Sequence, residues 1–164
     1  MPRTPDIIPL RDASFGFGLW PWSRGPLWRL AEDWSFVVVS GTSPPLPFTI
    51  PAGYEFDKAS VPSVLWGFPF NYTPDGLCTV PALEHDFLCD LLRGGSVWLR
   101  GRLGRVPAAP AAGVIHRHFY DKLLLWGVRP AKARAMWEAV RLFGPGGRAW
   151  PVNWMKAQHP NPKT

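Results

Sequence analysis

The sequence has little cysteine and no long hydrophobic run. Its 164 residues include two cysteines, Cys78 and Cys89, which are too few for a disulfide framework and suit a reducing setting, although one bridge remains allowed. No apolar run reaches the roughly 18 residues that a membrane-spanning helix needs. No charged n-region followed by an apolar h-region opens the chain. We therefore expect neither a transmembrane segment nor a secretory signal.

Acidic residues are fewer than basic ones. Twelve Asp and Glu face eighteen Lys and Arg, which gives a formal net charge of +6. This balance favours an anionic partner, such as nucleic acid, a phospholipid surface or an acidic protein, without choosing among them. One cluster stands among glycines and consists of Arg93, Trp98, Arg100, Arg102 and Arg105. We expect an exposed loop that binds anionic groups, with Trp98 as a stacking or interfacial anchor.

The composition limits the fold. Ten Trp, ten Phe and 46% hydrophobic residues exclude disorder as the default state, whereas twenty Pro and sixteen Gly argue against long uninterrupted elements. We expect an α+β fold in which a small antiparallel sheet from the N-terminal third packs against about three C-terminal helices. Residues 27–150 would form this single domain, preceded by an extended aromatic arm (1–26) and followed by a polar tail (151–164).

Proline and glycine indicate where the expected helices and strands begin and end. Residues 27–39 are rich in strand formers and predict a hairpin or two adjoining strands, and 48–50 predict a further short strand. Helices are expected over 81–92, 112–126 and 130–143, each ending near a glycine and two of them starting at a proline. Within the second helix, Arg117 and Asp121 are spaced as an i,i+4 ion pair.

His85 and Asp86 are the first candidates for chemistry. On a helix, adjacent side chains point about 100° apart, so the two do not form a dyad with each other, but they can serve one site. A histidine as general base beside a carboxylate that binds a divalent metal would suit hydrolysis. The alternative is a surface or helix-capping pair without chemistry.

His116 and Asp57 are the next candidates. The helical spacing turns His116 toward the interior, where its partner could be a backbone carbonyl, Asp86, Asp57 or a shared metal. Asp57 precedes a proline-stiffened turn, which holds a carboxylate at a fixed angle, although it could equally cap backbone N–H groups of that turn. The predicted catalytic set is thus His85, Asp86, Asp57 and His116, and the predicted ligands of a divalent metal are Asp86, Asp57 and His116.

The other histidines and the cysteines have weaker patterns. His118 and His159 are expected at the surface. Cys78, His85 and Cys89 allow a zinc site, but zinc sites usually add a closely spaced pair such as C-x-x-C, which the sequence lacks.

The ordered motifs resemble a known family. W-R-L-A-E-D-W, F-T-I-P-A-G-Y-E-F-D-K-A-S-V-P, A-L-E-H-D-F-L, H-x-x-F and A-V-R-L-F-G follow one another over about residues 28 to 144. The order is similar to that of short phage and prophage proteins of unassigned function, with the signature P-A-G-F-x-T-D-G-A-S-V-P, A-x-x-H-D-x-L-Y and A-D-x-x-F. The resemblance implies a viral origin, a place in the virion or the host cytoplasm, and other virion subunits as partners of the N-terminal arm.

The chain departs from this signature at three positions. Lys58 replaces the usual Gly, Cys89 stands near the usual Tyr, and His116 replaces the Asp of A-D-x-x-F. If that Asp serves a site, its exchange for an imidazole would change metal preference or remove activity. The signature is also similar in outline to secreted phospholipases that pair a catalytic His with a calcium-binding Asp. Only His85 and Asp86 match them, and their calcium loop and disulfides are missing.

Two functions follow as expectations. The first is a virion-associated structural or accessory component with a buried His-Asp polar centre. The alternative is a phage-encoded metal-dependent hydrolase that acts on lipid or the cell envelope, with His85 as general base and the arginine cluster on an anionic substrate.

Overall fold

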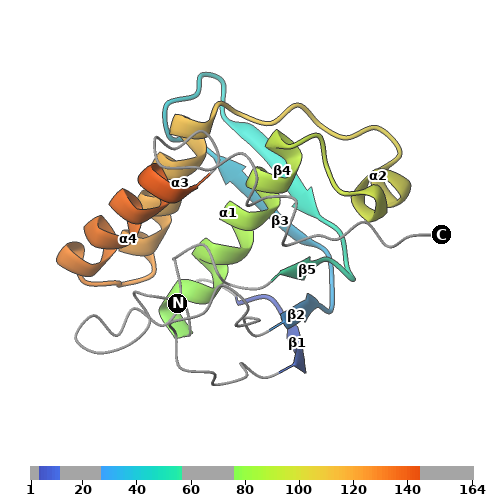
Figure 1. Cartoon of the computed structure of the whole chain (residues 1–164), viewed down its shortest axis with the longest axis horizontal. Coiled ribbons are helices and arrows are strands. Elements are labelled where there is room, and N and C mark those ends of the chain that lie inside the picture. The colour runs from blue at the N-terminus through green and yellow to red at the C-terminus, as the bar shows by residue number, and fades with distance from the viewer. Residues whose placement is uncertain (1–3, 12–26, 57–75, 145–164) are drawn as a thin grey trace.

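Strands come first along the chain and helices follow (Figure 1). The computed structural model describes residues 4–11, 27–56 and 76–144. Asp57, Lys58 and His159 lie outside these residues, as do most of the predicted arm and the whole predicted tail. The α+β prediction is confirmed.

The strands form two small antiparallel sheets. β1 (Ile7–Arg11), β2 (Leu27–Leu30) and β5 (Glu55–Phe56) make one sheet in the order β1-β2-β5. β3 (Trp34–Val38) pairs with β4 (Leu46–Ile50) in the other. Two adjoining strands over 27–39 were expected as one alternative, and β2 and β3 fit it. The hairpin alternative is wrong, because the two strands belong to different sheets.

One face of the β3–β4 pair is buried. Phe36 and Phe48 are register partners and their rings stack with centroids 5.7 Å apart. On the opposite face, the hydroxyls of Ser35 and Thr49 lie 3.0 Å apart. This alternation, which follows from the two-residue period of a strand, directs the aromatic side chains at the helices.

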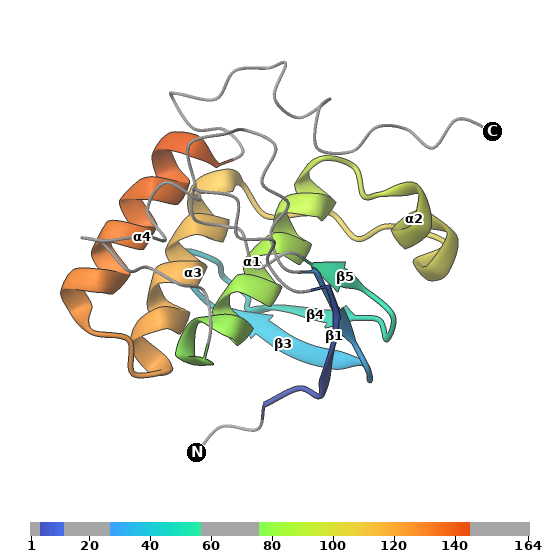
Figure 2. The same cartoon turned by 60° about the horizontal axis from the view of Figure 1, so that its bottom comes forward.

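Three helices of fourteen residues form the second layer (Figure 2). They are α1 (Thr79–Leu92), which follows the short 3-10 turn η2 (Gly76–Cys78), α3 (Ala112–Leu125) and α4 (Pro130–Phe143). Their bounds agree with the prediction to within two residues. α1 packs against α3, and α3 against α4. No helix in the described ranges has the length and apolarity to cross a bilayer.

A fourth helix, α2 (Val97–Leu103), lies where an exposed loop was expected. The hydroxyl of Ser96 accepts a hydrogen bond from the backbone N–H of Leu99 at 3.1 Å and so caps its first turn. Leu99 is completely buried. The loop prediction is therefore wrong: the glycines around 94–104 bound a short capped helix.

Two apolar clusters hold the layers together. One joins α1 to both sheets through side chains that include Phe36, Ile50 and Phe87. The other joins α3 to α4 through Phe119 and Met136, among others. The face of α1 that joins the first cluster contains four buried apolar residues, Leu83, Phe87, Leu88 and Leu91.

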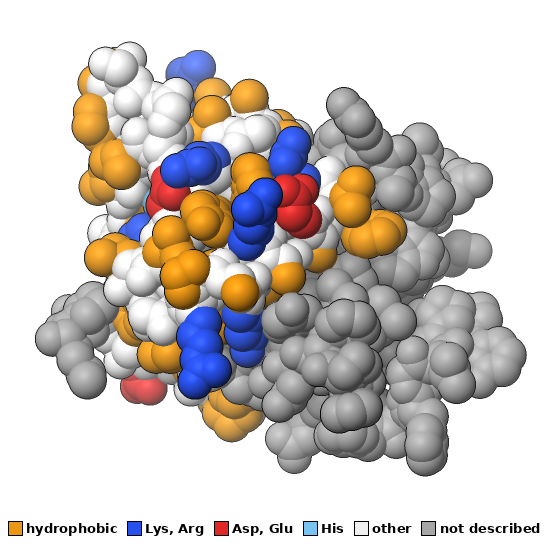
Figure 3. Space-filling model, turned by 90° about the vertical axis from the view of Figure 1, so that its left-hand side faces the viewer, with side chains coloured by type: hydrophobic (Ala, Val, Ile, Leu, Met, Phe, Trp, Pro, Cys, Tyr) orange, Lys and Arg blue, Asp and Glu red, His pale blue; other side chains and the backbone are white. Residues whose placement is uncertain are grey.

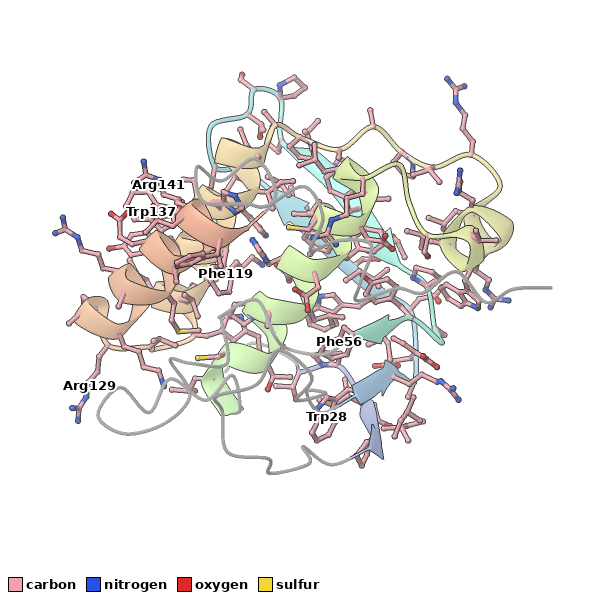
Figure 4. The ribbon with its side chains drawn as sticks, in the orientation of Figure 1. Trp28, Phe56, Phe119, Arg129, Trp137 and Arg141 are labelled. Atoms are coloured by element: carbon pink, nitrogen blue, oxygen red, sulfur yellow. The ribbon has the colours of Figure 1, made fainter. Side chains whose placement is uncertain are left out.

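The outer side of α3 and α4 is charged. The predicted pair of Arg117 and Asp121 forms, with 3.0 Å between Nε and Oδ1. On the side of the molecule that carries α4, basic side chains alternate with apolar and acidic ones (Figure 3). Arg141 lies 4.5 Å above the ring of Trp137 and pairs with Glu138 (Figure 4). Several arginines of this face therefore have a carboxylate or an aromatic ring as partner.

Candidate functional site

His85 of α1 and His116 of α3 meet where the two helices pack. Nε2 of His85 lies 3.1 Å from Nδ1 of His116, a hydrogen-bond distance. The side chains are only 3% and 4% exposed. Because one nitrogen of such a pair must carry the hydrogen and the other must accept it, the contact fixes a complementary tautomer on each ring. The prediction that His116 faces the interior is confirmed.

The surroundings of His85 keep its imidazole neutral. Burial, and after it the charges of Arg93 and His118, lower the pKa of His85 to about 3. The ring of Phe119 lies against it with centroids 4.8 Å apart. At neutral pH the side chain is therefore an uncharged hydrogen-bonding group and a weak base.

Asp86 lies beside this pair. Its Oδ1 is 3.8 Å from Nδ1 of His85, which is longer than a hydrogen bond. Asp86 is more exposed than either histidine. The structure thus brings together three of the four residues predicted as catalytic, whereas Asp57 lies outside the described residues.

Cys89 lies one helical turn from His85. Its Sγ is 3.6 Å from Nε2 and 3.8 Å from Nδ1 of that imidazole. Burial raises the pKa of the Cys89 thiol well above its usual range, and the charge of Asp86 raises it further. Cys89 therefore stays protonated, which does not suit a nucleophile.

The predicted metal site depends on Asp57, which lies outside the described residues. Among these residues, no group of three or more His, Cys, Asp or Glu side chains is arranged to hold a metal ion. Cys78, the third member of the zinc alternative, has its Sγ 4.0 Å from the sulfur of Met136. Metal binding by Asp86 and His116 together with Asp57 therefore stays a prediction.

A second buried polar cluster surrounds Glu84, which sequence reasoning missed. Glu84 is 0% exposed, and its Oε2 lies 2.9 Å from Nε2 of His118. The other oxygen accepts a hydrogen bond from Nε1 of Trp34 at 3.1 Å and from the ammonium of Lys122 at 3.3 Å. These donors come from β3 and α3, so one carboxylate of α1 binds both neighbouring elements. A buried carboxylate needs such compensation.

His118 corrects the sequence prediction, because this residue was expected at the surface and is buried. Its ring lies 5.7 Å from that of Phe36. The signal was present: His118 follows Ile115 by three residues, so both belong to one helical face. Likewise Glu84 precedes Phe87 and Leu88 by three and four residues. The sequence prediction counted only apolar residues on the buried faces of these helices, so polar residues at the same spacing were left out.

The glycine that ends α4 lies against the histidine centre. A Cβ on Gly144 would stand 3.0 Å from Cε1 of His116 and would overlap the carbonyl oxygen of Val140. Only a residue without a side chain fits there. The end of α4 thus helps to enclose His116.

The predicted anion-binding residues Arg93, Trp98, Arg100, Arg102 and Arg105 are all exposed. Arg93 directly follows α1, and its charge acts on His85. The others lie on or just after α2, at the edge of the molecule (Figures 1 and 2). They therefore form a surface of their own.

Comparison with known proteins places the chain in a family. A family model described as "Protein of unknown function (DUF1353)" matches residues 28–140. The chain belongs to the DUF1353 family. Both buried clusters lie inside the matched region, so the family model covers Glu84, His85, His116 and His118. Membership confirms the resemblance to a family of unknown function.

One relative is an uncharacterized protein, y4jT, from Sinorhizobium fredii (strain NBRC 101917 / NGR234). It is 30% identical over 123 residues, which are 73% of this chain and 30% of the relative. The chain thus spans less than a third of that protein's length. No solved structure matches the chain.

Proposed function

We propose that this DUF1353 chain is a virion-associated structural or accessory component of a bacteriophage, in which the buried histidines fasten α1 to α3. One observation carries the proposal: His85 and His116 are buried and hydrogen-bonded to each other across the two helices at 3.1 Å. The order of the sequence motifs, which is similar to that of phage and prophage proteins, supports the viral origin.

The state of His85 favours a structural role over a catalytic one. A general base works best with a pKa near the operating pH and with a nitrogen within reach of the substrate. The pKa of His85 is lowered to about 3, and its Nε2 contacts His116 instead. The same contact is useful for packing, since leaving a buried polar group without its partner costs about 1–3 kcal/mol.

The N-terminal strand supports assembly with a neighbour. Among the described strands β1 is at the edge of its sheet, and none of them pairs with its outer side. Ile8 and Leu10 of this strand are exposed. An exposed apolar edge strand is a common docking surface for another chain. We propose that the neighbour is another virion subunit, in the virion or during assembly in the host cytoplasm.

Mass spectrometry of purified particles tests the proposal. Particles released from an induced lysogen that encodes the chain should contain it at a fixed ratio to the other virion proteins. Replacing Ile8 and Leu10 by lysine should remove the chain from the particles, whereas Leu124→Lys with Leu125→Lys on α3 should not. Presence of the chain only in the cell lysate would contradict the proposal.

The second candidate is a phage-encoded metal-dependent hydrolase that acts on lipid or the cell envelope. The observation that favours it is the convergence of His85, Asp86 and His116, with 3.1 Å and 3.8 Å between the nearest atoms. In this proposal His85 is the general base, and Asp86, His116 and Asp57 bind a divalent cation. The arginines around α2 hold an anionic substrate.

Hydrolysis assays distinguish the two functions. The purified chain is incubated with phospholipid vesicles or cell-wall preparations, with and without added Ca²⁺, Mg²⁺ or Zn²⁺. Activity that disappears in His85→Asn while the melting temperature is kept would establish the hydrolase and overturn the structural proposal. His118→Asn serves as a control for loss of a buried histidine outside the predicted site.

A further inference from the structure

The segment around α2 carries charge of one sign only. Between residues 91 and 111 there are four arginines and no acidic residue. All four are exposed, namely Arg93, Arg100, Arg102 and Arg105. On the α4 side, by contrast, Arg117 and Arg141 each pair with a carboxylate. The α2 segment therefore presents a local positive charge that no acidic residue of its own offsets.

The outward face of α2 is apolar between its arginines. Leu99 and Leu103 pack inward. At 100° per residue, the opposite direction is occupied by Val97 and Gly101. Val97 is 76% exposed, and a Cβ added to Gly101 would meet no atom within 4 Å. Arginines flank these two positions, so the exposed aliphatic side chain of Val97 lies between basic side chains.

Trp98 follows Val97 in the chain, and its ring is supported by the backbone of a neighbouring turn. A Cβ on Gly53 would lie 3.3 Å from Cζ2 of its ring, so the indole rests on the turn between β4 and β5. The backbone of Gly53 has a φ of 85°, which glycine adopts without strain. The indole is nevertheless 46% exposed. It is thus a supported aromatic side chain that still faces solvent.

The chain folds back after α2 and brings its flanks together. A Cβ on Gly95 would meet Cγ2 of Val106 at 3.2 Å and Cγ of Arg100 at 3.5 Å. Arg105 is adjacent to this contact in the chain. The arginine that follows α2 is therefore kept near the start of the helix, on the same small projection.

We propose that this projection, formed by Val97, Trp98, Arg100, Arg102 and Arg105, binds the surface of a bilayer that contains anionic phospholipid. Arginines near such a surface are attracted to the lipid phosphates, and tryptophan is favoured at the boundary between headgroups and acyl chains. An exposed aliphatic side chain at the centre of the patch gains by shallow insertion into lipid, as in interfacial helices. A single-stranded nucleic acid would use the arginines and Trp98 but would leave Val97 in water. The inference is independent of the proposed virion role.

Vesicle flotation tests the proposal on the full chain. Binding is measured with phosphatidylcholine vesicles and with vesicles that also contain 30% phosphatidylglycerol. Binding is expected only to the second kind, and it should weaken as salt is raised. Arg100→Gln with Arg102→Gln should lower the partition coefficient about 30-fold, because each arginine near an anionic surface contributes about 1 kcal/mol. Val97→Ser should lower it about tenfold through loss of apolar burial.

Matched variants separate this patch from general charge and apolarity. Arg129→Gln with Arg134→Gln removes the same charge from the exposed side of α4, and Leu125→Ser removes another largely exposed aliphatic side chain, from α3. Both controls should bind like the unaltered chain. Equal losses in the controls would overturn the proposal. So would equal binding to both vesicles, or binding to a single-stranded oligonucleotide in the absence of any vesicle binding.

Discussion

The carboxylate of Glu84 lies 2.9 Å from Nε2 of His118, and this contact between two fully enclosed side chains joins α1 to α3. On α1 Glu84 directly precedes His85, and on α3 His118 follows His116 by two residues. The His85–His116 contact and the contacts of Glu84 with His118 and Lys122 thus cross the same helix interface. Their effects on stability can be separated by substitution.

Glu84→Ala is expected to destabilise the fold by about 3–5 kcal/mol, because it leaves His118 and Lys122 without their buried carboxylate. The measurement is urea unfolding followed by circular dichroism. Glu55→Ala is the control: Glu55 pairs with Arg29 at the surface, where such pairs contribute about 1 kcal/mol or less. Similar losses in the two variants would show that the Glu84 cluster is not specially stabilising.

Acid is expected to destabilise the protein through His85. Unfolding returns this imidazole to a pKa near 6.5, whereas its pKa in the fold is about 3. Between these values the unfolded chain binds a proton that the folded chain does not. Stability is therefore complete above pH 6.5 and falls toward pH 3 by about 1.4 kcal/mol per pH unit for this one group. His85→Asn should reduce the slope of unfolding free energy against pH between 6 and 4. An unchanged slope would exclude His85 as the source.

Gly144→Ala is expected to destabilise the protein by about 1–3 kcal/mol, as overpacking of an enclosed position does. Its new methyl group would approach the carbonyl oxygen of Val140 and the ring of His116. Thermal melting provides the measurement. Gly101→Ala is the contrasting variant, because its position inside α2 is open and alanine should stabilise that helix by about 0.5–1 kcal/mol. Neutral behaviour of Gly144→Ala would mean that the end of α4 does not press on His116.

Gly53→Ala tests the support of Trp98. The positive φ alone should cost about 1–3 kcal/mol, and the methyl group would also press on the indole at 3.3 Å. Gly127→Ala has nearly the same φ but open space around it, so it measures the backbone term by itself. A larger loss at Gly53 than at Gly127, in matched melting curves, is expected. Equal losses would show that Trp98 can move aside at no cost.

Much of the architecture was predictable from the positions of proline and glycine and from the pattern of apolar residues. Pro130 and the glycines after the predicted helices fixed the ends of α3 and α4 to within one residue, because these residues start or stop a helix for steric reasons. Strand-forming residues over 27–39 and 48–50 indicated β2, β3 and β4. The pairing of those strands was not predictable, since it depends on contacts between segments distant in sequence. β2 thus joins β1 and β5 rather than β3.

The candidate site was predicted in part. His85 and His116 were recognised, and their contact follows from one buried face on each helix. Glu84 and His118 were missed because the helical faces were drawn from apolar residues alone. Only the fold shows which partners the Glu84 carboxylate has, namely Trp34 from β3 and His118 and Lys122 from α3. The helix α2 was missed because the glycines around it indicated a loop, whereas Ser96 caps a helical turn there.

The three donors to Glu84 come from positions 50, 34 and 38 residues away along the chain. A partly folded state with α1 docked on β3 but not on α3 would bury the carboxylate with fewer donors than it needs, and so would the reverse arrangement. Such states are disfavoured, which couples the three elements into one cooperative unit. The amide hydrogens of β3, α1 and α3 should therefore exchange with solvent through a common opening reaction.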